Sequence, residues 1–240
     1  MIRAVLFCVA MAVPCVARAL DVAVATNFAG PLTQIAAAFT DATGEDVVIT
    51  AGSTGKLYAQ IRAGAPFDVF LSADRERPAL LHEQGRGGEP VTYATGRLVL
   101  WAGKDNLPGE GLTDALTDSG VRHVAVANPG LAPYGAAAVE VLQALDVFDT
   151  LEARLVYGQN VGQAHALAAS GNAQLALIAA SVAPDTGRVW TVPTNLHAPI
   201  RQDAILLRDD LQAKAFLTFL QSPRARDIIA AHGMIAGASE

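Results

Sequence analysis

The stretch that decides the fold class covers residues 21–72 and reads DVAVATNFAGPLTQIAAAFTDATGEDVVITAGSTGKLYAQIRAGAPFDVFLS. Three short runs of small and β-branched residues within it are typical of buried strands: Asp21–Ala25, Val47–Thr50 and Asp68–Ser72. Between them, apolar residues recur every three or four positions over 32–39 and 54–63, which indicates helices. The βαβαβ order predicts an α/β protein with a parallel sheet and helices on its faces.

The rest of the chain continues this alternation. Further strands are expected at Leu98–Ala102, Val121–Ala127, Leu155–Tyr157 and Gln174–Ala179, and further helices at Gly135–Leu145, Val161–Ser170, Leu211–Leu220 and Arg224–Ala231. An apolar run covers Ala204–Leu207. Irregular stretches are expected at Gly85–Pro90, Gly103–Ser119 and Thr191–Gln202. We predict two α/β lobes, the first from residues 20–100 and 203–240 and the second, inserted, from residues 101–202, with chain crossings near Leu98–Ala102 and Ile200–Leu206.

Composition narrows the class of partner. The chain has 240 residues, 52% of them hydrophobic and 17% charged, and a formal net charge of −6. It has no run of Lys or Arg. Nucleic acids and anionic membrane surfaces are bound through clustered positive charge, so neither is expected as a ligand.

The N-terminal segment has the pattern of a signal peptide. Arg3 precedes an apolar stretch over residues 4–16, and Ala17-Arg18-Ala19 has the small-x-small form of a cleavage site. The stretch is shorter than the roughly 20 residues that span a bilayer. Both cysteines, Cys8 and Cys15, lie in this segment. We therefore expect residues 1–19 to be removed on export to the periplasm, leaving a chain without thiols.

Four predicted strand-to-helix junctions carry hydrogen-bond donors. Their residues are Thr26 and Asn27, then Ser53 within Gly52–Gly55, then Tyr134 within Pro133–Gly135, and finally Asn160 to Gly162 around Val161. Ligands of open α/β sheets bind at the carboxyl ends of strands, where helix N-termini offer free N–H groups and a positive dipole end. Each junction alone is typical of an ordinary helix cap. Their joint occurrence predicts a cage of uncharged donors for an anion, with Lys56 as the one basic side chain nearby.

No metal site is expected from side-chain ligands. The five histidines, which are His82, His123, His165, His197 and His232, lack ligand spacing. Asp68 and Asp74 flank the third predicted strand. A carboxylate inside the cage would repel an anion, so we assign both to capping or hinge positions.

Five stretches of the chain resemble one known family. They are ATNFAGPL, AGSTGKLYAQIRAGAPFDVFLSAD, ANPGLAPYG, NVGQAHALAASGNAQLALI and FLQSPRARDIIAAHG. Together they resemble the periplasmic molybdate-binding proteins of molybdate ABC transporters, in the branch that has Thr-Asn after the first strand. The resemblance covers nearly the whole mature chain.

The resemblance implies a type II periplasmic-binding-protein fold of two lobes, each a mostly parallel sheet flanked by helices, that closes over a tetrahedral oxyanion. It implies that molybdate, and tungstate with it, is held by Thr26, Asn27, Ser53, Tyr134 and the backbone N–H of Val161, without a cofactor. It also implies a non-enzymatic monomer that delivers its cargo to an ABC permease in the inner membrane. One departure is that the chain reads LALIAASVA where many members have a further tyrosine.

Two other interpretations stay open at this point. The same fold with another oxyanion such as sulfate is one, because sequence does not measure the size of a cavity. The other is a hydrolase, because AGSTG differs at Ala51 from a Gly-x-Ser-x-Gly elbow and Ser53 is followed by Asp203 and His232. The elbow normally follows several earlier strands, whereas this one follows the second.

Overall fold

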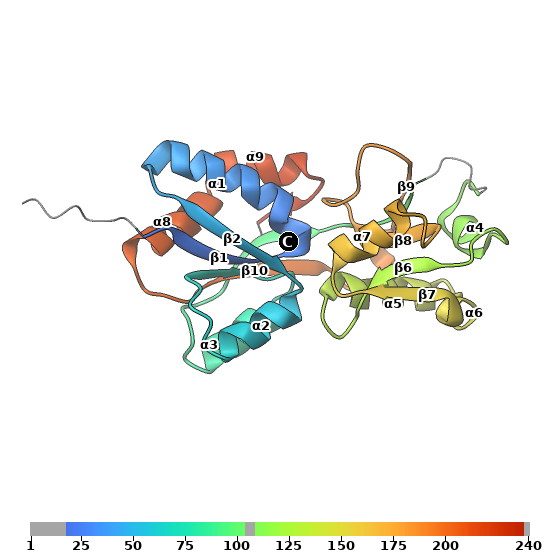
Figure 1. Cartoon of the computed structure of the whole chain (residues 1–240), viewed down its shortest axis with the longest axis horizontal. Helices are drawn as coiled ribbons and strands as arrows, with labels where there is room; N and C mark the ends of the chain where they lie inside the picture. The colour runs from blue at the N-terminus through green and yellow to red at the C-terminus, as the bar shows by residue number, and fades with distance from the viewer. Residues whose placement is uncertain (1–17, 104–108, 238–240) are drawn as a thin grey trace, which may run out of the picture.

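A computed structural model describes residues 18–103 and 109–237. Residues 1–17 of the predicted signal peptide lie outside the described residues. The described chain forms two lobes that lie end to end, each with its own sheet (Figure 1). Within these ranges, no helix is both long and apolar enough to cross a membrane.

The first lobe has a six-stranded mixed sheet in the order β11-β4-β10-β3-β1-β2. Its strands are β1 (Leu20–Ala25), β2 (Val47–Gly52), β3 (Val69–Leu71), β4 (Val91–Gly96), β10 (Ile200–Leu206) and β11 (Ile235–Ala236). Its helices are α1 (Ala29–Thr43), α2 (Thr54–Arg62), α3 (Glu76–Glu83), α8 (Leu211–Leu220) and α9 (Pro223–Ala231), with the 3-10 turn η1 (Thr26–Phe28) after β1. β1 pairs in parallel with β2 and β3, while β10 and β11 run antiparallel to their neighbours.

The second lobe has a five-stranded mixed sheet in the order β7-β6-β8-β5-β9. Its strands are β5 (Leu98–Ala102), β6 (Val124–Ala127), β7 (Leu155–Gly158), β8 (Leu175–Ala179) and β9 (Arg188–Thr191). Its helices are α4 (Leu112–Thr117), α5 (Pro133–Ala144), α6 (Phe148–Leu151) and α7 (Val161–Ala169), with η2 (Glu152–Arg154) and η3 (Thr194–Leu196). β6 is parallel to β7 and β8, and β5 is antiparallel to β8 and β9.

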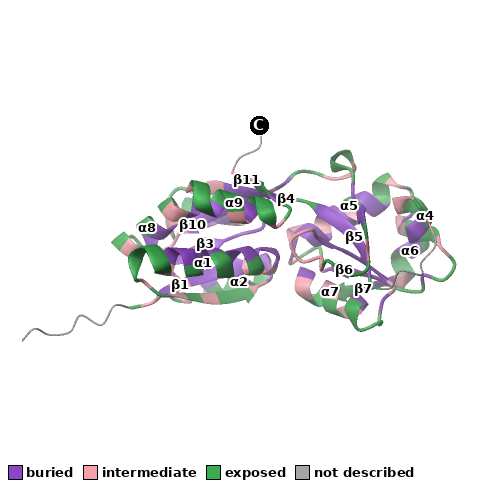
Figure 2. Cartoon of the chain, turned by 90° about the horizontal axis from the view of Figure 1, so that it is seen from above, coloured by how far each residue is buried: buried purple, intermediate pink, exposed green. Residues whose placement is uncertain are grey.

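Strand alternation builds a core on both faces of each sheet. Leu20, Val22 and Val24 of β1 point to one face, where they join the cluster under α1, α8 and α9. Ala23 points to the other face, toward α2 and α3. The second lobe is built the same way, with α5 over one face and α7 over the other. Figure 2 shows the central strands of both lobes as a buried layer, while the helices expose their outer faces. These facts confirm the α/β class. The prediction that each sheet is mostly parallel is wrong, because the parallel strands β3-β1-β2 and β7-β6-β8 occupy one side of each sheet and the other strand pairs are antiparallel.

Two stretches that were predicted to be irregular contain regular structure. The predicted loop Gly103–Ser119 contains α4, and residues 104–108 of it lie outside the described residues. The irregular stretch Thr191–Gln202 contains η3 and the first residues of β10. Strand β5 belongs wholly to the second sheet and β10 wholly to the first, so the sheets change between residues 96 and 98 and between 191 and 200. The predicted lobe limits, at residues 100/101 and 202/203, fall inside these strands and stay predictions.

Candidate functional site

The four donor-bearing junctions meet at one small cavity between the lobes. It is lined by Thr26, Asn27, Ser53, Tyr134 and Val161, together with their neighbours Ala25, Gly52, Thr54, Ala73, Ala132, Pro133 and Asn160. The volume that the centre of a water-sized sphere can occupy in it is about 10 Å³. Sites for drug-sized ligands occupy roughly 300–1,000 Å³, so this cavity suits only a small ligand. No Asp, Glu, Lys or Arg is among the lining residues.

The first lobe contributes the end of β1 and the start of α2. The Oγ1 of Thr26 donates to the carbonyl of Gly52 at 3.0 Å, so its hydroxyl proton is engaged within the lobe. Asn27 is 2% exposed, and its Nδ2 donates to Gln202 Oε1 at 2.9 Å. These bonds hold both side chains in fixed orientations at the cavity wall.

Ser53 is the cavity residue whose hydroxyl has no protein partner. It occupies the N-cap position of α2 with extended backbone angles, φ −70° and ψ 144°, yet its side chain caps no N–H group. Its Oγ is buried and has no hydrogen-bond partner. An unpaired buried hydroxyl costs about 1–3 kcal/mol. The Ser53 hydroxyl can therefore donate a hydrogen bond to a ligand in the cavity.

The second lobe contributes Tyr134 and Val161. Tyr134 lies in the first turn of α5 and is 1% exposed, and its hydroxyl oxygen accepts from Gln202 Nε2 at 3.2 Å. Burial raises the pKa of Tyr134, an effect partly opposed by hydrogen bonds from Gln202 and Asn27, so the phenol stays neutral and can donate. Val161 begins α7, where N–H groups have no partner within the helix.

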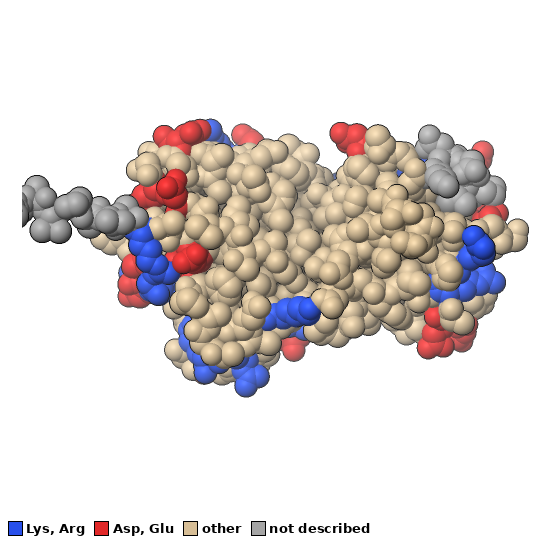
Figure 3. Space-filling view, viewed as in Figure 1, with Lys and Arg blue, Asp and Glu red and all other residues tan. Residues whose placement is uncertain are grey.

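Direct contacts join the two lobes around the cavity. Gly55 N donates to Leu131 O at 2.9 Å, and Ser181 Oγ donates to Asn27 O at 2.6 Å. Lys56 of α2 contacts Gln159, which precedes α7, through its ammonium group. Lys56 thus bridges the lobes and does not line the cavity. On the face in Figure 3, the junction of the lobes is covered mainly by uncharged side chains.

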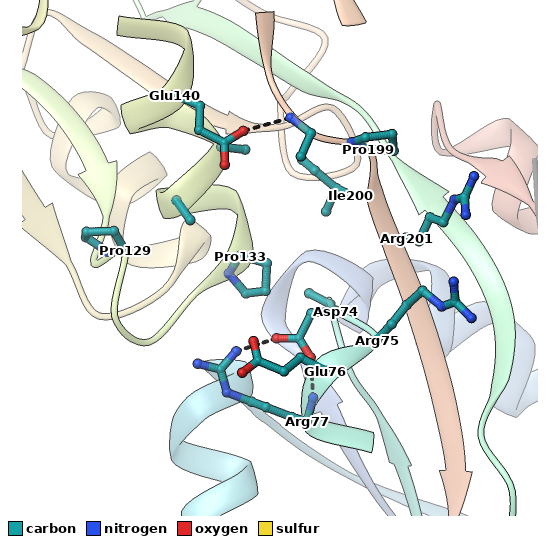
Figure 4. Close-up of a pocket in the computed structure, with 14 residues that line it drawn as sticks. Asp74, Arg75, Glu76, Arg77, Pro129, Pro133, Glu140, Pro199, Ile200 and Arg201 are labelled. Atoms are coloured by element: carbon teal, nitrogen blue, oxygen red, sulfur yellow. Dashed lines mark hydrogen bonds and ion pairs between the residues drawn. The ribbon is translucent and has the colours of Figure 1, made fainter. Parts of the chain in front are cut away.

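A larger groove between the lobes is unsuited to an anion. It has a volume of about 440 Å³ and is open to solvent beside the N-terminus of α3 and one face of α5, and Figure 4 shows Asp74, Glu76 and Glu140 among its lining residues. Two of its three arginines are paired, Arg77 with Asp74 and Arg75 with Asp203, while the buried Nε of Arg201 has no hydrogen-bond partner. The carboxylates would repel an anion, whereas the small cavity has none.

The residues of the predicted hydrolase are not assembled. Asp203 accepts from Thr92 Oγ1 at 2.6 Å and pairs with Arg75. His232 contacts the carbonyl of Ile228 and the side chain of Gln34. Neither residue lines the cavity that contains Ser53. The hydrolase interpretation is therefore wrong, because α9 holds His232 at its own C-terminus, on the α1 side of the sheet.

Asp68 and Asp74 have the structural roles expected of them. Asp68 Oδ2 accepts from the backbone N–H of Asp21 at 2.8 Å, and Arg208 lies 3.2 Å from its other oxygen. Asp74 Oδ1 accepts from the N–H of Arg77 in the first turn of α3 at 3.0 Å. Within residues 18–103 and 109–237, no group of three His, Cys, Asp or Glu is arranged to hold a metal ion.

Sequence reasoning missed two residues beside the cavity. Gln202 bonds to both Asn27 and Tyr134, and Ser181 donates to the backbone of Asn27. Gln202 lies in the stretch predicted to be irregular, and nothing local marks it as buried. Its place two residues before the apolar run at 204–207 is the one local signal in the sequence.

Two α/β lobes that meet over a small cavity of uncharged donors define a binding protein for a small solute, with the ligand enclosed between the lobes. The chain matches the profile of the bacterial extracellular solute-binding proteins over residues 20–235 and belongs to that family. It is thus a binding component rather than an enzyme.

Curated relatives and a solved structure agree with this assignment. The chain is 44% identical to the molybdate-binding protein ModA of Rhodobacter capsulatus, an alignment that covers 94% of this chain and 91% of that protein. It is 41% identical to ModA of Azotobacter vinelandii, over 91% of each chain. The structure of the periplasmic molybdate-binding protein of Azotobacter vinelandii superposes with a TM-score of 0.86 at 41% identity, covering 90% of this chain and 98% of that one. The family resemblance and the two-lobed fold predicted from sequence are confirmed.

Proposed function

We propose that this chain captures molybdate, and tungstate as well, between its lobes and delivers it to an ABC permease. The observation that carries the proposal is the Ser53 hydroxyl, which is buried, faces the cavity and lacks a partner. Asn27, Tyr134, the backbone N–H of Val161 and Thr26 are proposed as the other anion-binding residues, Thr26 by redirecting the hydroxyl that donates to Gly52 O in this structure. The names of the two relatives above 40% identity support molybdate as the ligand.

The chemistry of the cavity favours a fully ionised oxyanion. Hydrogen phosphate carries a proton that needs an acceptor, and a wall of N–H and O–H donors leaves that proton unpaired. Molybdate and tungstate have no proton near neutral pH and are larger than sulfate. Discrimination against sulfate must therefore come from the size of the cavity.

Export of the protein would determine where it meets its ligand. The predicted signal peptide, residues 1–19, would take the chain to the periplasm as a monomer, where it meets its cargo and the permease. The family is one of extracellular proteins, which supports this location. The lobes would close because the anion satisfies donors on both sides at once and so binds the closed state better than the open one.

A thermal-shift panel of oxyanions tests the proposal. Molybdate and tungstate are expected to raise the melting temperature, since a ligand at a thousand times its Kd stabilises the folded state by about 4 kcal/mol. Sulfate and phosphate at equal concentration are expected to give smaller shifts. A shift with sulfate or phosphate that exceeds the shift with molybdate would refute the assignment.

A further inference from the structure

Gln202 is a fully buried polar residue on the strand that enters the first lobe from the second. It is 0% exposed and lies on β10, whose pairing with β4 shifts register between Gln202 and Asp203. Such a bulge re-aims a side chain and is common beside functional sites. Here the bulge lies next to Gln202, whose side chain forms hydrogen bonds with Asn27 of the first lobe and Tyr134 of the second.

The hydrogen bonds of Gln202 fix the orientation of its amide. Its Oε1 accepts from Asn27 Nδ2 at 2.9 Å and lies 3.0 Å from the Tyr93 hydroxyl, whose single proton is shared between Gln202 Oε1 and Ser72 O, also 3.0 Å away. Its Nε2 therefore faces Tyr134, to whose hydroxyl oxygen it donates at 3.2 Å. An oxygen that accepts from this amide must direct its own single proton elsewhere. The cavity that Tyr134 lines is where an anion would accept that proton.

The backbone leaves room for this contact at one glycine. A Cβ on Gly96 would lie 1.9 Å from the Tyr134 hydroxyl oxygen and 2.7 Å from Gln202 Nε2. No side chain fits there without displacing one of the two groups. The close approach of β4, β10 and α5 therefore depends on Gly96.

We propose that Gln202 is a positioning residue of the oxyanion site: its amide, oriented by Asn27 and Tyr93, makes the Tyr134 hydroxyl a donor into the cavity. Gln202 does not line the cavity and acts through Tyr134. The inference rests on the proposed function and adds to it a residue that sets the direction of a hydrogen bond.

The variant Gln202→Glu tests this direction by pH. A protonated glutamic acid has one O–H donor for Tyr134 and a carbonyl oxygen for Asn27 and Tyr93, so it reproduces the amide. An ionised carboxylate can only accept hydrogen bonds. The Tyr134 hydroxyl would then donate to this carboxylate and not to the anion, and the negative charge of the carboxylate would also repel the anion. Burial raises a carboxyl pKa from about 4.3 toward neutrality. We expect molybdate affinity roughly 100-fold below wild type at about pH 8, recovering to within about 10-fold at about pH 5.5.

Other ionisable groups near position 202 do not produce this profile. They are Tyr93 on β4, Tyr134 on α5, Asp203 on β10 and Asp74 after β3. Burial raises the pKa of both tyrosines, which stay protonated across this range. The two carboxylates are paired with Arg75 and Arg77. Helices α3 and α8 pack on the apolar half of β10, against Ile205 and Ala204.

Gln174→Glu is the matched control. Gln174 Oε1 also accepts two hydrogen bonds, from the N–H groups of Arg122 and His123 at 3.0 and 2.8 Å, but it precedes β8 at the end of the sheet away from the cavity. Wild type and this control are expected to bind molybdate with nearly the same affinity at both pH values. Isothermal titration calorimetry with molybdate at each pH supplies the comparison.

A second variant covers the case in which Gln202→Glu fails to fold. Gln202→Met removes both bonding atoms at similar volume, and it is measured alone, beside Tyr134→Phe, and in the double variant. If Gln202 acts through the Tyr134 hydroxyl, the double variant loses less affinity than the product of the two single losses. Independent losses that multiply, or a Gln202→Glu profile as flat as wild type, overturn the inference. Failure of the wild-type protein to bind molybdate would instead overturn the proposed function.

Discussion

At the scale of the residue, one unpaired oxygen distinguishes the cavity. Six buried side-chain atoms of the described residues lack a hydrogen-bond partner, and Ser53 Oγ is the one among them that lines the cavity. Leaving a buried hydroxyl unpaired destabilises the unliganded fold, and a ligand that accepts its proton recovers that energy. Stability and binding therefore have opposite requirements at this position.

Replacing Ser53 by alanine is expected to separate these two requirements. Ser53→Ala should lower molybdate affinity by about 1–3 kcal/mol, or roughly 10- to 100-fold, while the unliganded protein melts at the same or a higher temperature. Ser222→Ala is the control, because Ser222 caps α9 by accepting from Ala225 N at 3.3 Å. It should cost about 1 kcal/mol of stability and leave affinity unchanged. Equal destabilisation by both changes, or unaltered binding in Ser53→Ala, would show that Ser53 is purely structural.

At the scale of the element, the site is made by the beginnings of helices. α2, α5 and α7 all start at the cavity, and each start offers N–H groups and the positive end of a helix dipole. α5 begins with Pro133, which suits a first turn, and α7 is capped by Asn160, whose Oδ1 accepts from Gln163 N at 3.0 Å. Several dipole ends from both lobes can hold a dianion without a basic side chain in the wall.

Asn160→Asp tests whether the start of α7 faces the anion. Aspartate caps a helix as well as asparagine and its charge favours an N-terminus, so the melting temperature of the unliganded protein should be unchanged or higher. The added negative charge at the cavity wall should weaken molybdate binding at least 10-fold. Asp210→Asn, at the N-cap of α8, keeps its bond to Ala213 N and should leave affinity unchanged. Wild-type affinity in Asn160→Asp, measured by calorimetry, would place the anion elsewhere.

At the scale of the whole molecule, the lobes come together where the chain passes between them. Gly96 ends β4 just before the chain enters the second sheet, and Gln202 lies on β10 just after it returns. These two residues and Tyr134 are in close contact across the junction. The chain thus crosses between the lobes at the same place where the lobes must approach each other to close over a ligand.

Gly96→Ala is expected to hold the lobes apart. The added methyl group would overlap the Tyr134 hydroxyl, so α5 must move away from β4 and the second-lobe donors lose their position. Molybdate affinity should fall by at least 10-fold, and small-angle scattering should show less compaction on adding ligand than in wild type. Gly30→Ala is the control, because a Cβ there meets no atom within 4 Å. Normal compaction in Gly96→Ala would contradict this account of the junction.

The sequence by itself predicted the elements whose evidence is local. The strands at 21–25 and 121–127, the capped helix after Ser222, and the donors at four junctions are all encoded within a few neighbouring residues. β4 was missed because its alternation is weak and its partner β10 lies more than 100 residues away, a separation that no local pattern crosses. Gln202 was missed for the same reason, since its three partners come from three distant segments.

Periodicity thus determined the α/β class and marked where donors stand along the chain, because side-chain direction in a helix or strand repeats over two to four residues. Tertiary structure alone decided which of those donors are already satisfied. The Thr26 hydroxyl bonds to Gly52, Asn27 is tied to Gln202, and the Ser53 hydroxyl is left without a partner. A hydrogen bond forms only when two groups come within about 3 Å, and segments far apart in sequence meet at that distance only in the folded molecule.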